Sequence, residues 1–130
     1  MLFIIIPAYN EEGNIGRVIS DLFEHGFKQA ESGFKQIIVV DDGSTDNTAQ
    51  IAKNAGAIVL RHEINRGQGA SLQTGNEYAL ANEAEIVVHF DADGQFNPAD
   101  IAPAVEALQK NKVEVVLGSR FLDNRSKIPR

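Results

Sequence analysis

Short apolar runs alternate with longer segments of helical periodicity along the chain. Runs of four or five residues that are rich in β-branched and aromatic side chains, and bounded by turn residues, are typical of strands buried on both faces of a sheet. The sequence therefore predicts five strands, at residues 2–6, 36–40, 57–60, 86–90 and 113–117.

A helical segment follows each of the first four strands. The first segment repeats apolar residues at helical spacing from Ile15 to Phe23, and the third is rich in small residues that would let a helix lie close to a sheet. The expected helices cover residues 15–23, 46–55, 71–81 and 98–108. Their candidate N-caps include Asn10, either Ser44 or Thr45, and Asn97.

This alternation indicates the fold class. Strands and helices at this spacing form right-handed βαβ units, which build a mostly parallel sheet. We therefore expect an α/β, Rossmann-like fold with helices on both faces of the sheet, truncated after about the fifth strand. The 130 residues suffice for one domain. We expect it to cover residues 1–123, with residues 124–130 as a loosely ordered tail.

Charge and composition narrow the range of partners. The formal net charge of −6 argues against nucleic acid, although the segment after Gly118 is locally basic. The basic tail alone is more typical of a solvated chain end than of a phosphate site. The absence of cysteine fits a reducing compartment, so we expect a cytoplasmic protein. The apolar run at residues 2–6 is too short to span a membrane.

Acidic turns follow three of the predicted strands. They are Asn10–Glu12, Asp41–Asp42 and Asp91–Asp93. Because the carboxyl ends of parallel strands form the ligand-binding edge of such a sheet, we expect these turns to lie close together. In an extended segment Asp91 and Asp93 would project to the same side, where a divalent cation, Mg²⁺ or Mn²⁺, would relieve their repulsion. The alternative is an ordinary Asp-rich turn.

A cation at this edge would favour a polyanionic ligand. Divalent cations commonly bridge protein carboxylates and substrate phosphates, so a nucleoside diphosphate is a natural candidate. Asp41 or Asp42 could accept a hydrogen bond from a base N–H or a ribose hydroxyl, and Tyr9 offers a flat face for stacking.

Four segments in this order resemble the donor-site motifs of family 2 glycosyltransferases, which have the GT-A fold. The resemblance covers residues 3–121 and is carried by Ile5–Glu12, Val39–Asp46, Asn65–Gly67 and Phe90–Gln95. Within that family the chain is most similar to the polyprenyl-phosphate group, which includes dolichol-phosphate mannosyltransferases, because Gly118–Phe121 follows the fifth predicted strand.

The resemblance implies a role for each matching position. The residues implied in nucleotide binding are Pro7, Tyr9 and Glu11 around the nucleoside, Asp41 at the base, Asp42 and Gly43 in the same turn, and Arg66 and Gly67 nearby. The residues implied near the reacting groups are Asp91 and Asp93 as metal and diphosphate ligands, Gln95 beside the sugar, and Arg120 at a phosphate. Asp93 and Arg120 are the implied catalytic residues.

The implied reaction is inverting transfer of a sugar from a UDP- or GDP-linked donor to an acceptor, with a lipid phosphate at a membrane face as the candidate acceptor. Members of the family continue beyond this length into an acceptor-binding portion. The chain therefore resembles the nucleotide-binding portion of a longer enzyme, and its own turnover is in question. The sequence does not indicate the oligomeric state.

Other interpretations compete with this one. A non-catalytic nucleotide-sugar-binding module would share the motifs, and a Mg²⁺-dependent phosphoacceptor domain would share the sheet, although its acid pair would follow the first strand. A dinucleotide fingerprint beginning at Gly67 fails at Leu72. Arg66 could be a solvated loop residue and Glu11 only a helix-dipole partner. The three histidines are not grouped at metal-ligand spacing, so we expect them to be structural.

Overall fold

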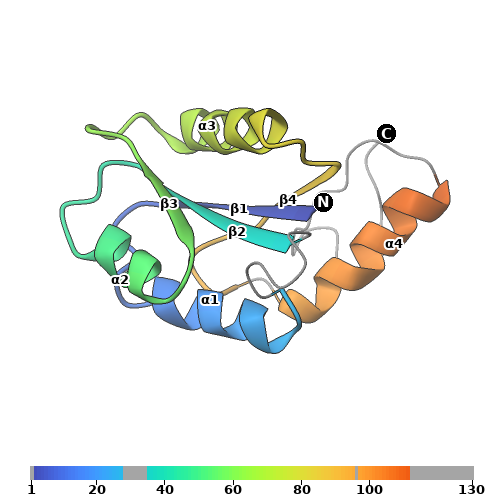
Figure 1. The fold of residues 1–130 in the computed structure, drawn as a ribbon. Helices are drawn as coiled ribbons and strands as arrows, with labels where there is room; N and C mark the ends of the chain where they lie inside the picture. Colours follow the sequence, from blue (N-terminus) through green and yellow to red (C-terminus); the bar gives the residue numbers. More distant parts are fainter. Residues whose placement is uncertain (1, 28–34, 96, 112–130) are drawn as a thin grey trace.

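The computed structural model describes residues 2–27, 35–95 and 97–111 (Figure 1). Within these residues four parallel strands form one sheet in the order β3-β2-β1-β4. The strands are β1 (Leu2–Ala8), β2 (Lys35–Asp41), β3 (Ile58–Arg61) and β4 (Ile86–His89). The helices are α1 (Ile15–Glu24), α2 (Thr48–Asn54), α3 (Gln68–Ala81) and α4 (Ile101–Asn111), the last preceded by the single turn η1 (Pro98–Asp100).

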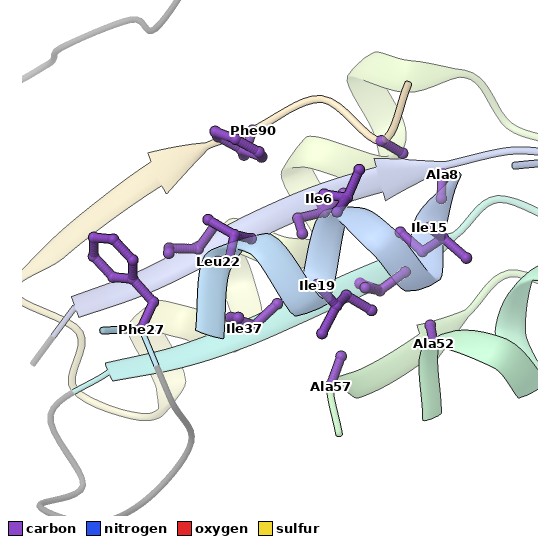
Figure 2. Close-up of a cluster of buried hydrophobic side chains, with 14 of the residues drawn as sticks. Ile6, Ala8, Ile15, Ile19, Leu22, Phe27, Ile37, Ala52, Ala57 and Phe90 are labelled. Atoms are coloured by element: carbon purple, nitrogen blue, oxygen red, sulfur yellow. The ribbon is translucent and has the colours of Figure 1, made fainter. Parts of the chain in front are cut away.

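Helices cover both faces of the sheet, as predicted. Helix α3 lies across one face, and α1 and α2 lie across the other (Figure 1). Alternate residues of β1 supply the two cores because successive side chains of a strand point to opposite faces. Ile4 and Ile6 pack with α1, whereas Phe3 and Ile5 belong to the core on the α3 face. Figure 2 shows the larger core, in which Ile19 and Leu22 lie over β1 and β2.

Helix α3 packs unusually close to the sheet because its inward positions are small. Its buried residues are Ser71, Gly75 and Ala79. An ideal Cβ atom built on Gly75 would lie 2.3 Å from Cγ2 of Ile5. The expectation that small residues allow a close approach is therefore confirmed, and Gly75 is the point of contact.

Two of the expected helix caps are wrong. Asn10 does not cap α1, because it has a left-handed backbone (φ 52°) and its side chain bonds to another loop. The α2 start is held by Asp46, whose Oδ1 accepts from the Thr48 N–H at 3.0 Å. Asn97 caps as expected, since its Oδ1 accepts from the Ala99 N–H at 2.9 Å.

The last predicted strand, residues 113–117, and the predicted tail, residues 124–130, lie outside the described residues. No helix in the described ranges is long and apolar enough to cross a membrane.

Candidate functional site

A cleft of about 370 Å³ lies at the carboxyl edge of the sheet. The turns after β1, β2 and β4 meet there with the start of α3, so the predicted convergence of the acidic turns is confirmed. The residues that line the cleft are Pro7, Ala8, Tyr9, Glu11, Asp42, Asn65, Gly67, Gln68, Ser71, Asp91, Ala92 and Asp93.

The cleft is strongly acidic. Four carboxylates line it, those of Glu11, Asp42, Asp91 and Asp93. In the part of the chain that the structure describes, no lysine, arginine or histidine is among the lining residues. A phosphate group entering alone would meet only like charge, so this surface suits an anion only together with a cation.

Asp91 and Asp93 reach the cleft from a turn, not from an extended strand. Strand β4 ends at His89, and the Asp93 Oδ1 accepts from the Gln95 N–H at 3.0 Å. The argument from strand alternation is thus wrong in its geometry, although both carboxylates line the cleft.

The donor set of the cleft suits a hard divalent cation. No group of three or more metal-ligating side chains occurs among the described residues. Mg²⁺ is commonly held by one or two carboxylates and completed by substrate phosphates and water. Asp91 and Asp93 fit that pattern as two oxygen ligands beside an open space.

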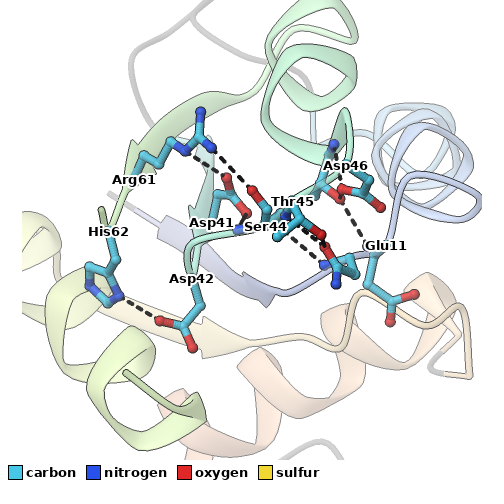
Figure 3. Close-up of polar contacts among 10 residues, drawn as sticks. Glu11, Asp41, Asp42, Ser44, Thr45, Asp46, Arg61 and His62 are labelled. Carbon is cyan, nitrogen blue, oxygen red and sulfur yellow. Dashed lines mark hydrogen bonds and ion pairs between the residues drawn. The ribbon is translucent and has the colours of Figure 1, made fainter. Parts of the chain in front are cut away.

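The two acids after β2 have different environments (Figure 3). Asp41 is wholly buried and does not line the cleft. It accepts from the Ser44 N–H at 3.3 Å, and its Oδ2 lies 3.3 Å from Nε of Arg61. Asp42 is also buried, but it lines the cleft. The contact of Asp41 with a base stays a prediction, and Asp42 is the acid of this pair that the cleft exposes to a ligand.

Asp42 also organises one wall of the cleft. Its Oδ1 accepts from Nδ1 of His62 and from the Arg66 N–H, and its Oδ2 accepts from the Gly67 N–H, each at 2.8 Å. Burial raises the pKa of Asp42, but these hydrogen bonds outweigh it and lower the pKa below the usual value. The carboxylate therefore stays ionised while it fixes the loop that leads into α3.

The turn after β1 is tied to the turn after β2. The Asn10 N–H donates to Oγ of Ser44 at 2.8 Å, and the Asn10 Oδ1 accepts from the Thr45 N–H at 2.9 Å. The Glu11 N–H donates to Oγ1 of Thr48 at 2.9 Å. These bonds hold the backbone of the turn that carries Tyr9, a residue that is 46% exposed and lines the cleft.

Glycine is required in the second turn for two reasons. Gly43 has φ 74°, which favours glycine, and an added Cβ would lie 2.6 Å from backbone atoms of Ile64 and Asn65. The close approach brings the residue 63–66 loop against the turn, where Asn65 lines the cleft. Gly43 thus allows the close contact between this turn and the residue 63–66 loop.

Four predicted residues that the structure describes, Asp41, Gly43, Arg66 and Gln95, are not among those that line the cleft. The side chains of Arg66 and Gln95 are exposed and do not line it, although the backbone N–H groups of both residues bond to Asp42 and Asp93. Arg120 lies outside the described residues.

Sequence reasoning missed several residues of the same wall. Asn65, Gln68 and Ser71 line the cleft, and His62 supports Asp42 from behind. Ser71 follows Gly67 by one helical turn, and its Oγ donates to the Gly67 carbonyl at 3.1 Å, so helical spacing could have indicated it. His62 directly follows β3, which pairs with the strand that carries the acids.

In open parallel α/β sheets, nucleotides and other ligands bind at the carboxyl ends of the strands, and the cleft lies at that edge. The sequence comparison specifies the class further. The chain belongs to glycosyl transferase family 2, whose sequence pattern matches residues 3–129. This confirms the resemblance drawn from the motifs.

Named relatives and solved structures agree with this assignment. The chain is 38% identical over 138 residues to the UDP-N-acetylglucosamine–dolichyl-phosphate N-acetylglucosaminyltransferase of Methanococcus voltae, covering 93% of this chain and 52% of that enzyme. It is 31% identical to a dolichyl-phosphate β-glucosyltransferase of Trichomonas vaginalis, covering 97% of this chain and 42% of the relative. The chain thus spans about half the length of the curated relatives it matches.

The fold comparison gives the same answer. Glucosyl-3-phosphoglycerate synthase from Mycobacterium tuberculosis, solved with Mn²⁺, UDP and glucosyl-3-phosphoglycerate, superposes with a TM-score of 0.67 at 28% identity. The match covers 83% of this chain and 39% of that one. The structural neighbours are GT-A glycosyltransferases, so the predicted GT-A fold is confirmed.

Proposed function

We propose that this chain is the donor-binding part of a family 2 glycosyltransferase that takes a nucleoside diphosphate sugar together with Mg²⁺ or Mn²⁺ and transfers the sugar to a polyprenyl phosphate. The observation that carries the proposal is the cleft itself, with four carboxylates and no described basic side chain at the carboxyl edge of the sheet.

Different lining residues are proposed to contact different parts of the nucleoside diphosphate sugar. Tyr9 would stack on the base and Asp42 would accept a hydrogen bond from the nucleoside. Asp91 and Asp93 would hold the cation, which would bind the diphosphate. Glu11 and Pro7 shape the nucleoside end, because both line the cleft beside Tyr9. The cation, when bound, neutralises the charge that develops on the departing nucleoside diphosphate.

The acceptor oxygen attacks the anomeric carbon from the face opposite the leaving group. The bond to the acceptor forms as the bond to the diphosphate breaks, which inverts the configuration. A lipid phosphate is already an anion at neutral pH, so no protein base is required to remove a proton from it. The dolichyl-phosphate relatives support this acceptor class, and Arg120 is the proposed contact to a phosphate.

Calorimetric titration tests the donor site. UDP-glucose and GDP-mannose are each titrated with Mn²⁺ and with EDTA into the wild type, Asp93→Ala and the control Asp100→Ala, an exposed acid that does not line the cleft. We expect binding that needs Mn²⁺, is lost in Asp93→Ala and persists in Asp100→Ala. UDP is the first choice because structural neighbours were solved with it. Equal binding in EDTA would contradict the cation's role.

Catalysis by the chain is a separate question. A non-catalytic module would bind the donor with Mn²⁺ but release no nucleoside diphosphate. Incubation with donor and a short polyprenyl phosphate, followed by assay of free nucleoside diphosphate, separates this alternative from an active transferase. Sugar transfer at the cytoplasmic face of a membrane stays a prediction.

A further inference from the structure

His62 lies outside the cleft lining but is bonded to the acid that faces the cleft. It directly follows β3, and its backbone N–H donates to the Asp41 carbonyl at 2.9 Å, which extends the pairing with β2 by one residue. That backbone bond places the imidazole beside Asp42. His62 is 7% exposed and Asp42 4% exposed, so water does not compete strongly for their contact.

The partners of the ring determine which nitrogen carries the proton. An ionised carboxylate has no proton to give, so the 2.8 Å contact between Nδ1 and the Asp42 Oδ1 requires a proton on Nδ1. The other ring nitrogen, Nε2, lies 2.8 Å from Oγ1 of Thr74, which is hydrogen-bond distance. Thr74 lies in α3, so His62 connects the acid to the helix whose first turn lines the cleft.

The hydrogen bonds to Asp42 nearly exhaust its acceptor capacity. A carboxylate has about four acceptor positions. His62 and the Arg66 N–H use two of them on Oδ1, and the Gly67 N–H uses one on Oδ2. One position on Oδ2 is left for a donor group of a ligand. Rotation of the carboxylate would therefore disturb the loop and the ligand position together.

We propose that His62 is a positioning residue of the nucleotide cleft. Its Nδ1–H holds the Asp42 carboxylate in one orientation, in which the carboxylate fixes the residue 63–66 loop and Gly67 and presents Oδ2 to the nucleoside. The proposal rests on the proposed function of the cleft. Thr74 supports the ring from α3 through its contact with Nε2.

Two amide substitutions separate the roles of the two ring nitrogens. The side-chain nitrogen of Asn falls near the position of Nδ1, and that of Gln near the position of Nε2. His62→Asn can thus keep the bond to Asp42 and lose Thr74, whereas His62→Gln keeps the Thr74 contact and loses Asp42. A merely structural histidine would respond similarly to the two changes. Thr74→Val removes only the partner of Nε2.

The test measures the free protein and the complex separately. Amide hydrogen exchange at Arg66 and Gly67 reports the loop without ligand, and calorimetry with UDP and Mn²⁺ reports the nucleotide. We expect His62→Gln to weaken UDP binding about ten- to hundredfold, the size of losing one hydrogen bond to a charged group, and to speed exchange at both amides about tenfold. His62→Asn should stay within about threefold of the wild type in both, and Thr74→Val should lie between them.

The outcomes distinguish the two proposals. If the wild type binds UDP and the Gln and Asn variants are equally weakened, or both unchanged, the positioning role of His62 is refuted and the proposed function stands. If the wild type binds no nucleotide with Mn²⁺, the proposed function fails and the inference falls with it, whatever the exchange rates show. Thermal unfolding of each variant confirms that the fold is intact.

Discussion

Substitution of Gly75 by alanine should destabilise the protein, although alanine is the better helix former. Gly75 lies within α3, and an ideal Cβ there would be 2.3 Å from Cγ2 and 3.3 Å from Cδ1 of Ile5, and 3.3 Å from Cγ2 of Val40. Cγ2 is attached directly to the Cβ of a fully buried β-branched residue, so it cannot rotate away as a flexible chain end could. The helix or the strand must shift.

The magnitude follows from two opposing effects. Overpacking of a core costs about 1–3 kcal/mol, and the contact at Gly75 belongs at the upper end of that range. The gain in helix propensity from glycine to alanine is about 1 kcal/mol. The expected net loss is therefore about 2 kcal/mol in the free energy of unfolding.

Gly69 provides a matched control within the same helix. An added Cβ at Gly69 would meet nothing within 4 Å, so Gly69→Ala should be neutral or stabilise by up to about 1 kcal/mol. Urea unfolding followed by circular dichroism measures both variants. A Gly75→Ala protein as stable as Gly69→Ala would refute the close approach of α3. In a double-mutant cycle, Ile5→Ala should cost less in the Gly75→Ala background than alone, because it removes the clashing methyl group.

Three further predictions concern the turns of the cleft. Gly43→Ala should weaken UDP–Mn²⁺ binding at least tenfold in calorimetry, because its φ is 74° and its Cβ would meet the backbone of the neighbouring loop at 2.6 Å; unchanged affinity would argue against that contact. Asn10→Ala should lower the free energy of unfolding by about 1–3 kcal/mol, because it removes the side-chain bond to Thr45 and strains the left-handed backbone. Asn10→Gly should lower it by less, because glycine adopts that backbone without strain. Equal losses would show that the side-chain bonds alone cause the effect. The pKa of Asp42 is lowered in the folded state, so its contribution is present above the unfolded value near 3.8 and is lost as pH falls through the folded pKa. Urea unfolding between pH 5 and pH 2 should therefore depend less steeply on pH in Asp42→Asn than in the wild type, and parallel curves would contradict this.

The strands could be predicted because a strand of a doubly covered parallel sheet must be apolar on both faces. Residues 3–6 and 37–40 are all buried, so they appear in sequence as unbroken apolar runs. The location of the acidic turns could be predicted from the same topology, because the turns that follow parallel strands all lie at one edge of the sheet. Helix α3 was harder to predict, because its inward face consists of Ser71, Gly75 and Ala79, which carry little hydrophobic signal.

The errors arose where side chains bond across long sequence distances. Asn10 resembles a local helix cap, but its side chain bonds to Thr45, 35 residues away. The different environments of Asp41 and Asp42 could not be predicted either, because they depend on Arg61 at the end of the adjacent strand β3 and on His62 directly after it. The sequence shows to which turn an acid belongs. Which of the two acids faces the cleft depends on the side chains that pack against them in the folded protein.

These two acids show how one turn can serve stability and recognition together. Asp41 is fully buried beside Arg61, whose Nη2 also donates to the Ser44 carbonyl at 3.1 Å. Arg61 therefore bonds to both Asp41 and Ser44 and stabilises the turn. Asp42, one residue later, points to the other side and ties the turn to the start of α3. The turn is thus held by the end of β3 on one side and by the start of α3 on the other, so we expect the ionised Asp42 to keep its position when a ligand binds. Pre-organisation of this kind raises affinity by reducing the cost of ordering the site on binding, so the supports of Asp42 should matter more to nucleotide affinity than their distance from the cleft suggests.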